Sequence, residues 1–193
     1  MADLTKTSQL ATKTGAKVFV AYNRRFYSST LKAKELIKKD GGVLSFNFDF
    51  TERSHLIEKS DKSPAVKKEW LLANSSHVID LAFFLGGKPK KITSYKTGGL
   101  SWHPSGSIYS GSGVSKNGAL FSYHANWESA GNWYLEILTP KRKLIFRPLE
   151  KLQVQEKGQM PIEEVVFVNK IDLDFKPGLY KLVQSFFGSK QNL

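Results

Sequence analysis

Large apolar residues alternate with polar ones in several stretches of the chain, as is typical of half-buried β-strands. In residues 43–51 one face is apolar, formed by Leu44, Phe46, Phe48 and Phe50, and the other is polar, formed by Ser45, Asn47, Asp49 and Thr51. The same period predicts strands over 119–127 and 133–137, within a region from 88 to about 169 that is mostly β.

Helical spacing of apolar residues predicts four helices. Three are expected over 3–14, 28–39 and 75–85, and each is followed by glycine, which can end a helix in the left-handed conformation. We expect Leu31, Leu36 and Ile37 to face inward from the second. The last helix begins near Pro177 and carries an apolar stripe formed by Leu179, Leu182, Val183, Phe186 and Phe187.

Three further segments complete the predicted fold. Residues 17–22 are unbrokenly apolar up to Tyr22, a pattern that favours a strand covered on both faces. Residues 53–63 are polar and indicate a loop, and the glycine-rich residues 106–118 indicate hairpins and turns with no phosphate role. The order of elements predicts a single α+β domain over 1–193, with helices packed on one face of an open, largely antiparallel sheet.

Composition narrows the class of protein. Apolar residues make up 40% of the chain, with 13 Phe, 7 Tyr and 4 Trp, enough for a substantial core. The sequence has no cysteine, which excludes disulfides and thiolate chemistry. It shows no signal peptide and no apolar run long enough to span a bilayer, so we expect a cytoplasmic protein without a membrane partner.

The net charge of +12 raises the question of a nucleic-acid partner. The lysines, however, are scattered in pairs such as Lys38-Lys39, Lys67-Lys68 and Lys90-Lys91. We therefore expect a solvated basic surface and no nucleic-acid partner.

Two segments carry further information when they are taken together: Tyr22-Asn-Arg-Arg-Phe26 at the end of the apolar stretch and Ala73-Asn-Ser-Ser-His-Val-Ile-Asp80 at the start of a helix. In this order and at this spacing they resemble the glucose–fructose oxidoreductase / inositol dehydrogenase / MocA (Gfo/Idh/MocA) family. In that family a Y-N-R-R-F strand end precedes a D-x-G-x-H-x-x-D helix start that supplies the catalytic histidine. The resemblance covers essentially the whole chain and implies the C-terminal, substrate-side domain of an NAD- or NADP-dependent sugar or polyol oxidoreductase.

The chain departs from the family pattern in two ways. The family's glycine-rich dinucleotide turn and its E-K-P lysine would precede residue 1, so we expect the N-terminal Rossmann domain to be absent and this chain alone to bind no cofactor. The family's catalytic aspartate, four residues before the histidine, is Ala73 here. A non-catalytic binding or assembly module with the same fold is therefore the alternative function.

His77 is the first candidate for chemistry. Asn74 or Ser75 can cap the helix that starts here, which places His77 in its first turn. The positive end of a helix disfavours imidazolium, so we expect a neutral ring that can accept a proton from a substrate hydroxyl. Without the resemblance, a structural histidine bonded to a neighbouring loop would be the better interpretation.

The other candidate residues are expected to bind substrate. Arg24 and Arg25 end a predicted strand, and we expect one of the two to form a structural ion pair. Asp80, one helical turn after the histidine, either orients its ring or pairs with an arginine. The remaining candidates for contacts to a sugar or polyol are Tyr22, Asn23 and Asn74.

The remaining aromatic and histidine residues carry weaker expectations. His55, His103 and His124 show no metal-ligand spacing, so no metal site is expected. We expect Trp102, Trp127 and Trp133 to lie in the core or an interface more readily than against a sugar ring. We also expect a homo-oligomer that forms through the exposed face of the sheet.

Overall fold

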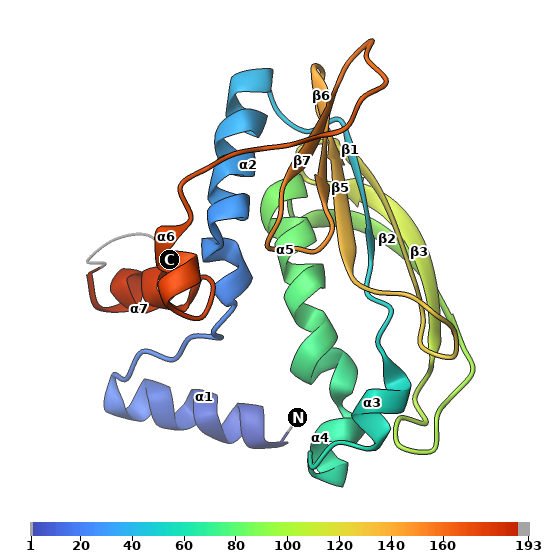
Figure 1. Ribbon diagram of the computed structural model, residues 1–193. Helices are drawn as coiled ribbons and strands as arrows, with labels where there is room; N and C mark the ends of the chain where they lie inside the picture. Colours follow the sequence, from blue (N-terminus) through green and yellow to red (C-terminus); the bar gives the residue numbers. More distant parts are fainter. Residues whose placement is uncertain (1, 189–193) are drawn as a thin grey trace.

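The computed structural model describes residues 2–188 and is built on one eight-stranded sheet (Figure 1). The strands lie in the order β2-β3-β4-β1-β5-β6-β7-β8, and all neighbours are antiparallel except β1 and β4. Their bounds are β1 Ser45–Asp49, β2 Pro89–Thr97, β3 Ile108–Ser115, β4 Leu120–Asn126, β5 Tyr134–Leu138, β6 Arg142–Phe146, β7 Gln153–Glu156 and β8 Glu163–Glu164. The predicted fold class is confirmed.

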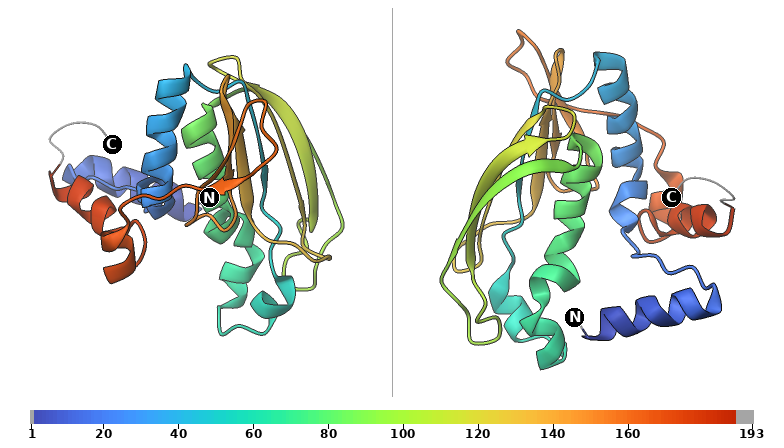
Figure 2. Two further views of the ribbon diagram at one scale, coloured as in Figure 1. Left: turned by 45° about the horizontal axis from the view of Figure 1, so that its top comes forward. Right: turned by 180° about the vertical axis from the view of Figure 1, so that it is seen from behind.

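The helices lie on one face of the sheet, and the other face has no helical cover among the described residues (Figures 1 and 2). Helix α5 (Ser76–Gly86) packs on the centre of the sheet, and α2 (Ser28–Asp40) lies beside it. The short helices α3 (Ser54–Glu58) and α4 (Pro64–Lys68) follow β1, and α4 leads through the π-helical turn η2 (Leu71–Ser75) into α5.

The core lies between these helices and the sheet. Phe46 and Phe48 on β1 are at most 2% exposed, as the alternation predicts, and α5 buries Val78 and Leu81 completely against the sheet. The neighbouring strands add Phe121, Leu135, Ile137, Leu144 and Phe146 on the same face. Because side chains alternate along a strand, the opposite face of these strands carries the polar positions.

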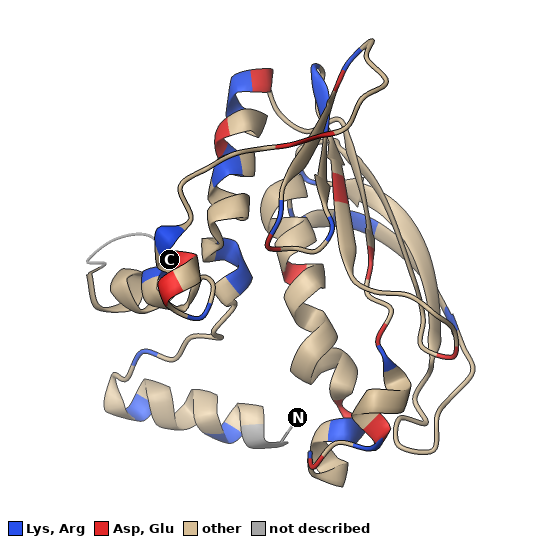
Figure 3. Ribbon diagram, viewed as in Figure 1, with Lys and Arg blue, Asp and Glu red and all other residues tan. Residues whose placement is uncertain are grey.

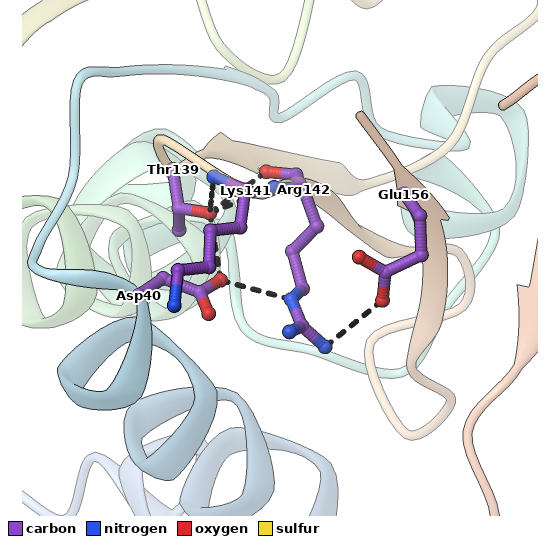
Figure 4. A network of polar contacts seen from close by, with 5 residues as sticks. All are labelled: Asp40, Thr139, Lys141, Arg142 and Glu156. Atoms are coloured by element: carbon purple, nitrogen blue, oxygen red, sulfur yellow. Dashed lines mark hydrogen bonds and ion pairs between the residues drawn. The ribbon is translucent and has the colours of Figure 1, made fainter. Parts of the chain in front are cut away.

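A network of polar contacts ties the end of α2 to the turn between β5 and β6 (Figure 4). The fully buried Asp40 carboxylate accepts hydrogen bonds from Thr139 Oγ1 at 2.8 Å and Arg142 Nε at 2.9 Å. Arg142 also pairs with Glu156 on β7 at 3.0 Å. The network therefore fixes the helix to three strands.

The edge strand β2 is exposed at all nine positions. It carries Pro89, Lys90, Lys91 and Lys96, whereas the opposite edge, β8, consists only of Glu163 and Glu164. Next to β2, strand β3 has glycines on the helix side, and a Cβ at Gly111 or Gly113 would overlap the ring of Tyr123 or Phe121. Most of the glycine-rich segment is thus strand β3 (Ile108–Ser115), and the predicted hairpin turn is confined to residues 116–118, which lead into β4.

The apolar segment 17–22 was also predicted wrongly. It is not a strand in the described structure, and Val18 and Val20 are 61% and 71% exposed. The segment connects α1 (Ala2–Thr14) to the 3₁₀ helix η1 (Asn23–Phe26) on the side of α2 away from the sheet (Figure 1). No strand lies beside it there to cover its side chains.

Other local predictions need smaller corrections. Residues 54–58 form α3 rather than loop, and Leu31 of α2 is 39% exposed rather than turned inward. After the short helix α6 (Lys170–Asp174), the last helix forms over Leu179–Gly188 as α7, but none of its residues is buried. Phe186 of α7 contacts Phe19, with ring centroids 5.4 Å apart, so its stripe faces the N-terminal segment rather than the core.

No helix within residues 2–188 combines the length and the apolar character needed to cross a membrane. Lys and Arg are distributed over α1, α2 and α4 and over several strands rather than gathered on one element (Figure 3). This distribution agrees with a solvated basic surface.

Candidate functional site

The two sequence motifs meet where η1, the end of β1 and the start of α5 come together. A cavity of about 340 Å³ opens there, and its lining includes Arg24, Glu52, Arg53, Asn74, Trp133 and Glu150. The motif residues Arg24 and Asn74, fifty positions apart in sequence, thus line one cavity. Its size is within the range of small-molecule pockets.

His77 is half-buried on α5, beside Tyr22. The two rings meet edge to face, with centroids 5.4 Å apart and an interplanar angle of 88°. Nδ1 is buried without a hydrogen-bond partner among the described residues. Burial and, after it, the charge of Arg24 lower the pKa of His77, against the opposing effect of Asp80. The ring is therefore neutral at pH 7 and able to accept a proton.

The cause of this neutrality differs from the one expected from the sequence. The helix does not start at His77, because η2 continues the backbone directly into α5. Neither Asn74 nor Ser75 caps α5. Asn74 lies within η2, and Ser75 has helical backbone angles and makes no side-chain capping bond. The dipole of a helix acts mainly in the first turn after a free end, and no free end lies at His77. Burial and Arg24, rather than the helix dipole, therefore lower the pKa of His77.

Arg25 is the arginine that forms the structural ion pair. Its Nε and Nη2 atoms bind the two oxygens of Asp80 at 2.8 and 2.5 Å, in a bidentate arrangement that joins η1 to α5. The Asp80 hydrogen bond is the largest cause that raises the pKa of Arg25. Asp80 is thus bound to an arginine, and no hydrogen bond to the His77 ring is present in the described structure.

Arg24 has a different environment. Its guanidinium lies 4.8 Å from the centroid of the Trp133 ring and faces the cavity. Within residues 2–188 it has no carboxylate within ion-pair distance. Trp133 therefore lies at the candidate site, whereas Trp127 is fully buried and Trp102 stacks on it at 6.0 Å, as expected of core residues.

Asn23 is a structural residue in this arrangement. It is 9% exposed, and its Nδ2 donates a hydrogen bond to the carbonyl of Pro177 at 2.9 Å. This contact ties η1 to the segment before α7. The amide nitrogen of Asn23 is thus engaged by the protein, and the expected contact of Asn23 with a sugar or polyol stays a prediction.

Glu52 is the site residue that sequence reasoning missed. It is 7% exposed, and its carboxylate accepts hydrogen bonds from Ser75 Oγ at 2.6 Å and from Asn74 Nδ2 at 3.1 Å. Burial raises the pKa of Glu52, and the bonds from Ser75 and Asn74 oppose that effect. In the sequence it belongs to a polar stretch after a strand, and only its position beside η2 reveals its burial.

The other histidines lie elsewhere. His103 is buried with Nδ1 2.8 Å from the carbonyl of Gly106, which is a structural contact. His124 pairs with Asp49 at 2.9 Å on the uncovered face of the sheet, and His55 is exposed on α3. The described residues contain no cluster of three or more His, Asp or Glu that could hold a metal ion.

No protein-family model matches the sequence, and no curated protein matches it. Solved structures do match the fold. A levoglucosan dehydrogenase in complex with NADH and levoglucosan is 21% identical over 77% of this chain and 46% of its own, with a TM-score of 0.61. An oxidoreductase from Thermotoga maritima is 18% identical over 97% of this chain and 57% of its own, with a TM-score of 0.68.

An NAD-binding oxidoreductase from Klebsiella pneumoniae gives a TM-score of 0.63, with 16% identity over 83% of this chain and 50% of its own. The chain thus spans about half the length of the solved structures it matches. At these identities the comparison concerns the fold. The chain has the fold of one part of such oxidoreductases, as its resemblance to the Gfo/Idh/MocA family led us to expect.

Proposed function

We propose that this chain is the substrate-side domain of a NAD(P)-dependent sugar or polyol oxidoreductase. The observation that carries the proposal is the neutral ring of His77, whose Nδ1 has no partner among the described residues and which follows Asn74 of the polar cavity by one helical turn. Oxidation of an alcohol releases the hydroxyl proton, and His77 is the group proposed to accept it. Levoglucosan in one structural neighbour and L-sorbose in another support a sugar-like ligand.

The described residues do not fit a dinucleotide. The turn that follows the parallel strand β1 is Phe50-Thr-Glu-Arg53, which contains no glycine, whereas dinucleotide turns need glycines for close approach to the pyrophosphate. We therefore propose that residues 2–188 alone bind no nicotinamide. NADH in the levoglucosan dehydrogenase complex supports a nicotinamide for a longer parent protein.

The alternative is a binding or assembly module without catalysis. Ala73 favours it, because an alanine cannot replace the carboxylate that the resembled family has at this position. The two functions differ in whether the His77 ring meets the ligand.

Imidazole ¹H–¹⁵N NMR spectra of the purified chain, titrated with levoglucosan or L-sorbose, test the proposal. We expect the His77 resonances to shift with a saturable dependence on the sugar, while those of the exposed His55 stay unchanged. Shifts absent from His77 at saturating sugar would leave only the binding or assembly function.

Cofactor binding is a separate prediction. We expect isothermal titration of the chain with NADH or NADPH to give no heat of binding, because the described residues contain no glycine-rich turn from a strand into a helix. Micromolar binding of either nucleotide would contradict this expectation.

A further inference from the structure

The cavity at the candidate site contains a guanidinium that lacks a counter-ion. Arg25 is paired with Asp80, and Arg142 is paired with Asp40 and Glu156. Arg24 alone of these three has no carboxylate within 4.0 Å among the described residues, although Glu52 and Glu150 line the same cavity. Its planar group is held over the Trp133 ring at 4.8 Å.

A guanidinium that is oriented by an aromatic ring and has no carboxylate partner can bind an anionic ligand. A guanidinium binds carboxylate through two parallel hydrogen bonds, and stacking on an aromatic ring orients it for that contact. Trp133 therefore supplies the orientation, and the cavity supplies the space for the ligand.

The neighbouring acid is already engaged by the protein. Glu52 is directed to Ser75 and Asn74 rather than to Arg24, so it does not neutralise the guanidinium. Asn74 uses its Nδ2 on Glu52, which leaves its Oδ1 to accept a hydrogen bond from a hydroxyl. The cavity thus combines an anion-binding group with a hydroxyl-binding group.

From this arrangement we propose that the cavity binds a polyhydroxy carboxylate, a sugar acid, with its carboxylate on Arg24 and a hydroxyl on Asn74. The inference rests on the proposed function and narrows its substrate class from sugars in general to their acids. A neutral sugar would leave the Arg24 guanidinium without its counter-ion.

The state of Glu52 adds a pH dependence to this binding. Because burial raises the pKa of Glu52, the carboxyl is protonated over a wider pH range than usual. A protonated Glu52 does not repel a bound carboxylate, whereas an ionised one does. Affinity for a sugar acid should therefore fall as the pH rises through the pKa of Glu52 in the folded protein.

The test compares D-glucuronate with D-glucose, which differ only in the oxidation of one carbon, by NMR titration of the purified chain at constant ionic strength. We expect glucuronate to bind at least about tenfold more tightly. Arg24→Gln should abolish this preference, and Arg24→Lys, which keeps the charge but loses the fork, should retain part of it. Lys90→Gln removes one positive charge from the exposed edge strand β2, outside this cavity, and is the matched control; it should change the preference little.

Each alternative outcome has a defined meaning. Equal affinity for the two sugars, or a preference that survives Arg24→Gln, overturns the sugar-acid proposal. If the His77 ring still shifts with glucose, the proposed function stands without it. Glucuronate binding without any His77 shift supports the acid site and argues against the proton-accepting role. Tighter binding of glucose 6-phosphate than of glucuronate would identify a phosphate site and overturn the assignment of a carboxylate.

Glu52→Gln tests the pH dependence separately. The wild-type chain should bind glucuronate less tightly as the pH rises, and the variant should show a flat profile between the same pH values. A slope unchanged by the substitution would remove Glu52 from the site.

Discussion

At the scale of single residues, His77 shows how burial sets a protonation state. The imidazole is half-buried, its Nδ1 has no partner among the described residues, and Arg24 disfavours a second positive charge nearby. These effects act without a free helix end, so the ring is neutral for reasons that depend on tertiary structure. A sequence motif can mark the position, but it cannot supply the burial.

This protonation state has a consequence for stability. The pKa of His77 is lowered in the folded protein from its ordinary value of 6.5, so the unfolded chain binds the proton more tightly. The contribution of the neutral His77 ring to the free energy of unfolding is therefore complete above pH 6.5 and is lost as the pH falls through the lowered pKa. His77→Asn should flatten this part of the profile of unfolding free energy against pH, measured by urea denaturation.

The control for this prediction is His55→Asn, on the exposed surface of α3. It should leave the slope as in the wild type. If the His77 variant showed the same slope of unfolding free energy against pH as the wild type, the ring would have the same pKa in the folded and the unfolded chain.

The sequence motifs contain residues that the structure brings close together, whereas the sequence did not point to Glu52. Arg24, Asn74 and His77 were predicted from the motifs, and the structure brings Arg24 and Asn74 into one cavity with Arg24 acting on His77. Glu52 lies in the segment Thr51-Glu-Arg-Ser-His55, whose polarity suggests a solvated loop. Its burial depends on η2, twenty residues later, which no local pattern reveals.

At the scale of elements, the Asp40 network connects α2 to the β5–β6 turn. Asp40→Ala leaves the Arg142 guanidinium with only Glu156 and removes one of the two acceptors of the Thr139 hydroxyl, the other being the carbonyl of Arg142. We expect a loss of about 2 kcal/mol of unfolding free energy, because a largely buried guanidinium that loses a hydrogen-bond acceptor still carries the cost of its desolvation. Urea denaturation at pH 7 measures it.

The surface pair between Lys151 and Glu164 provides the matched comparison, since both side chains are more than half exposed. Glu164→Ala should cost less than about 1 kcal/mol. Similar losses for the two variants would contradict a structural role for the buried network.

Elements with a period of two were predicted well from the sequence because one face of each strand meets the helices. Phe46 and Phe48 on β1, and Leu135 and Ile137 on β5, are buried as their spacing predicts. The unbroken apolar segment 17–22 was not predicted well, because an apolar run indicates burial but does not show which element covers it. In residues 2–188 no strand supplies that partner, and the segment stays exposed.

At the scale of the whole molecule, the uncovered face of the sheet remains the predicted site of self-association. Leu135 and Ile137 do not contribute to this face, because they lie on the helix side, and Val166 and Val168 lie exposed outside any strand. The uncovered face combines polar residues in register, such as Asn47, Ser122 and Ser112, with the apolar residues Val114 and Leu120. A twofold contact of such faces would combine hydrogen bonds with apolar burial.

We still expect a dimer or tetramer in analytical ultracentrifugation at micromolar concentration. Ser122→Glu at the centre of this face should raise the dissociation constant at least about tenfold by placing two like charges at a twofold contact. Ser8→Glu on the exposed surface of α1 should not. A single species of monomer mass in the wild type would refute the prediction.

The two open edges of the sheet also affect whether the protein aggregates at high protein concentration. Edge strands promote fibril growth when their backbone groups can pair with another molecule, and lysine and proline on an edge oppose such pairing. Here β2 carries three lysines and Pro89, while β8 offers only two residues for pairing. The protection at β2 is electrostatic and fades in concentrated salt, where charges act over only about 3 Å. We therefore expect dilute buffer to keep the edge strands of neighbouring molecules from pairing. Concentrating the protein in high salt should promote such pairing.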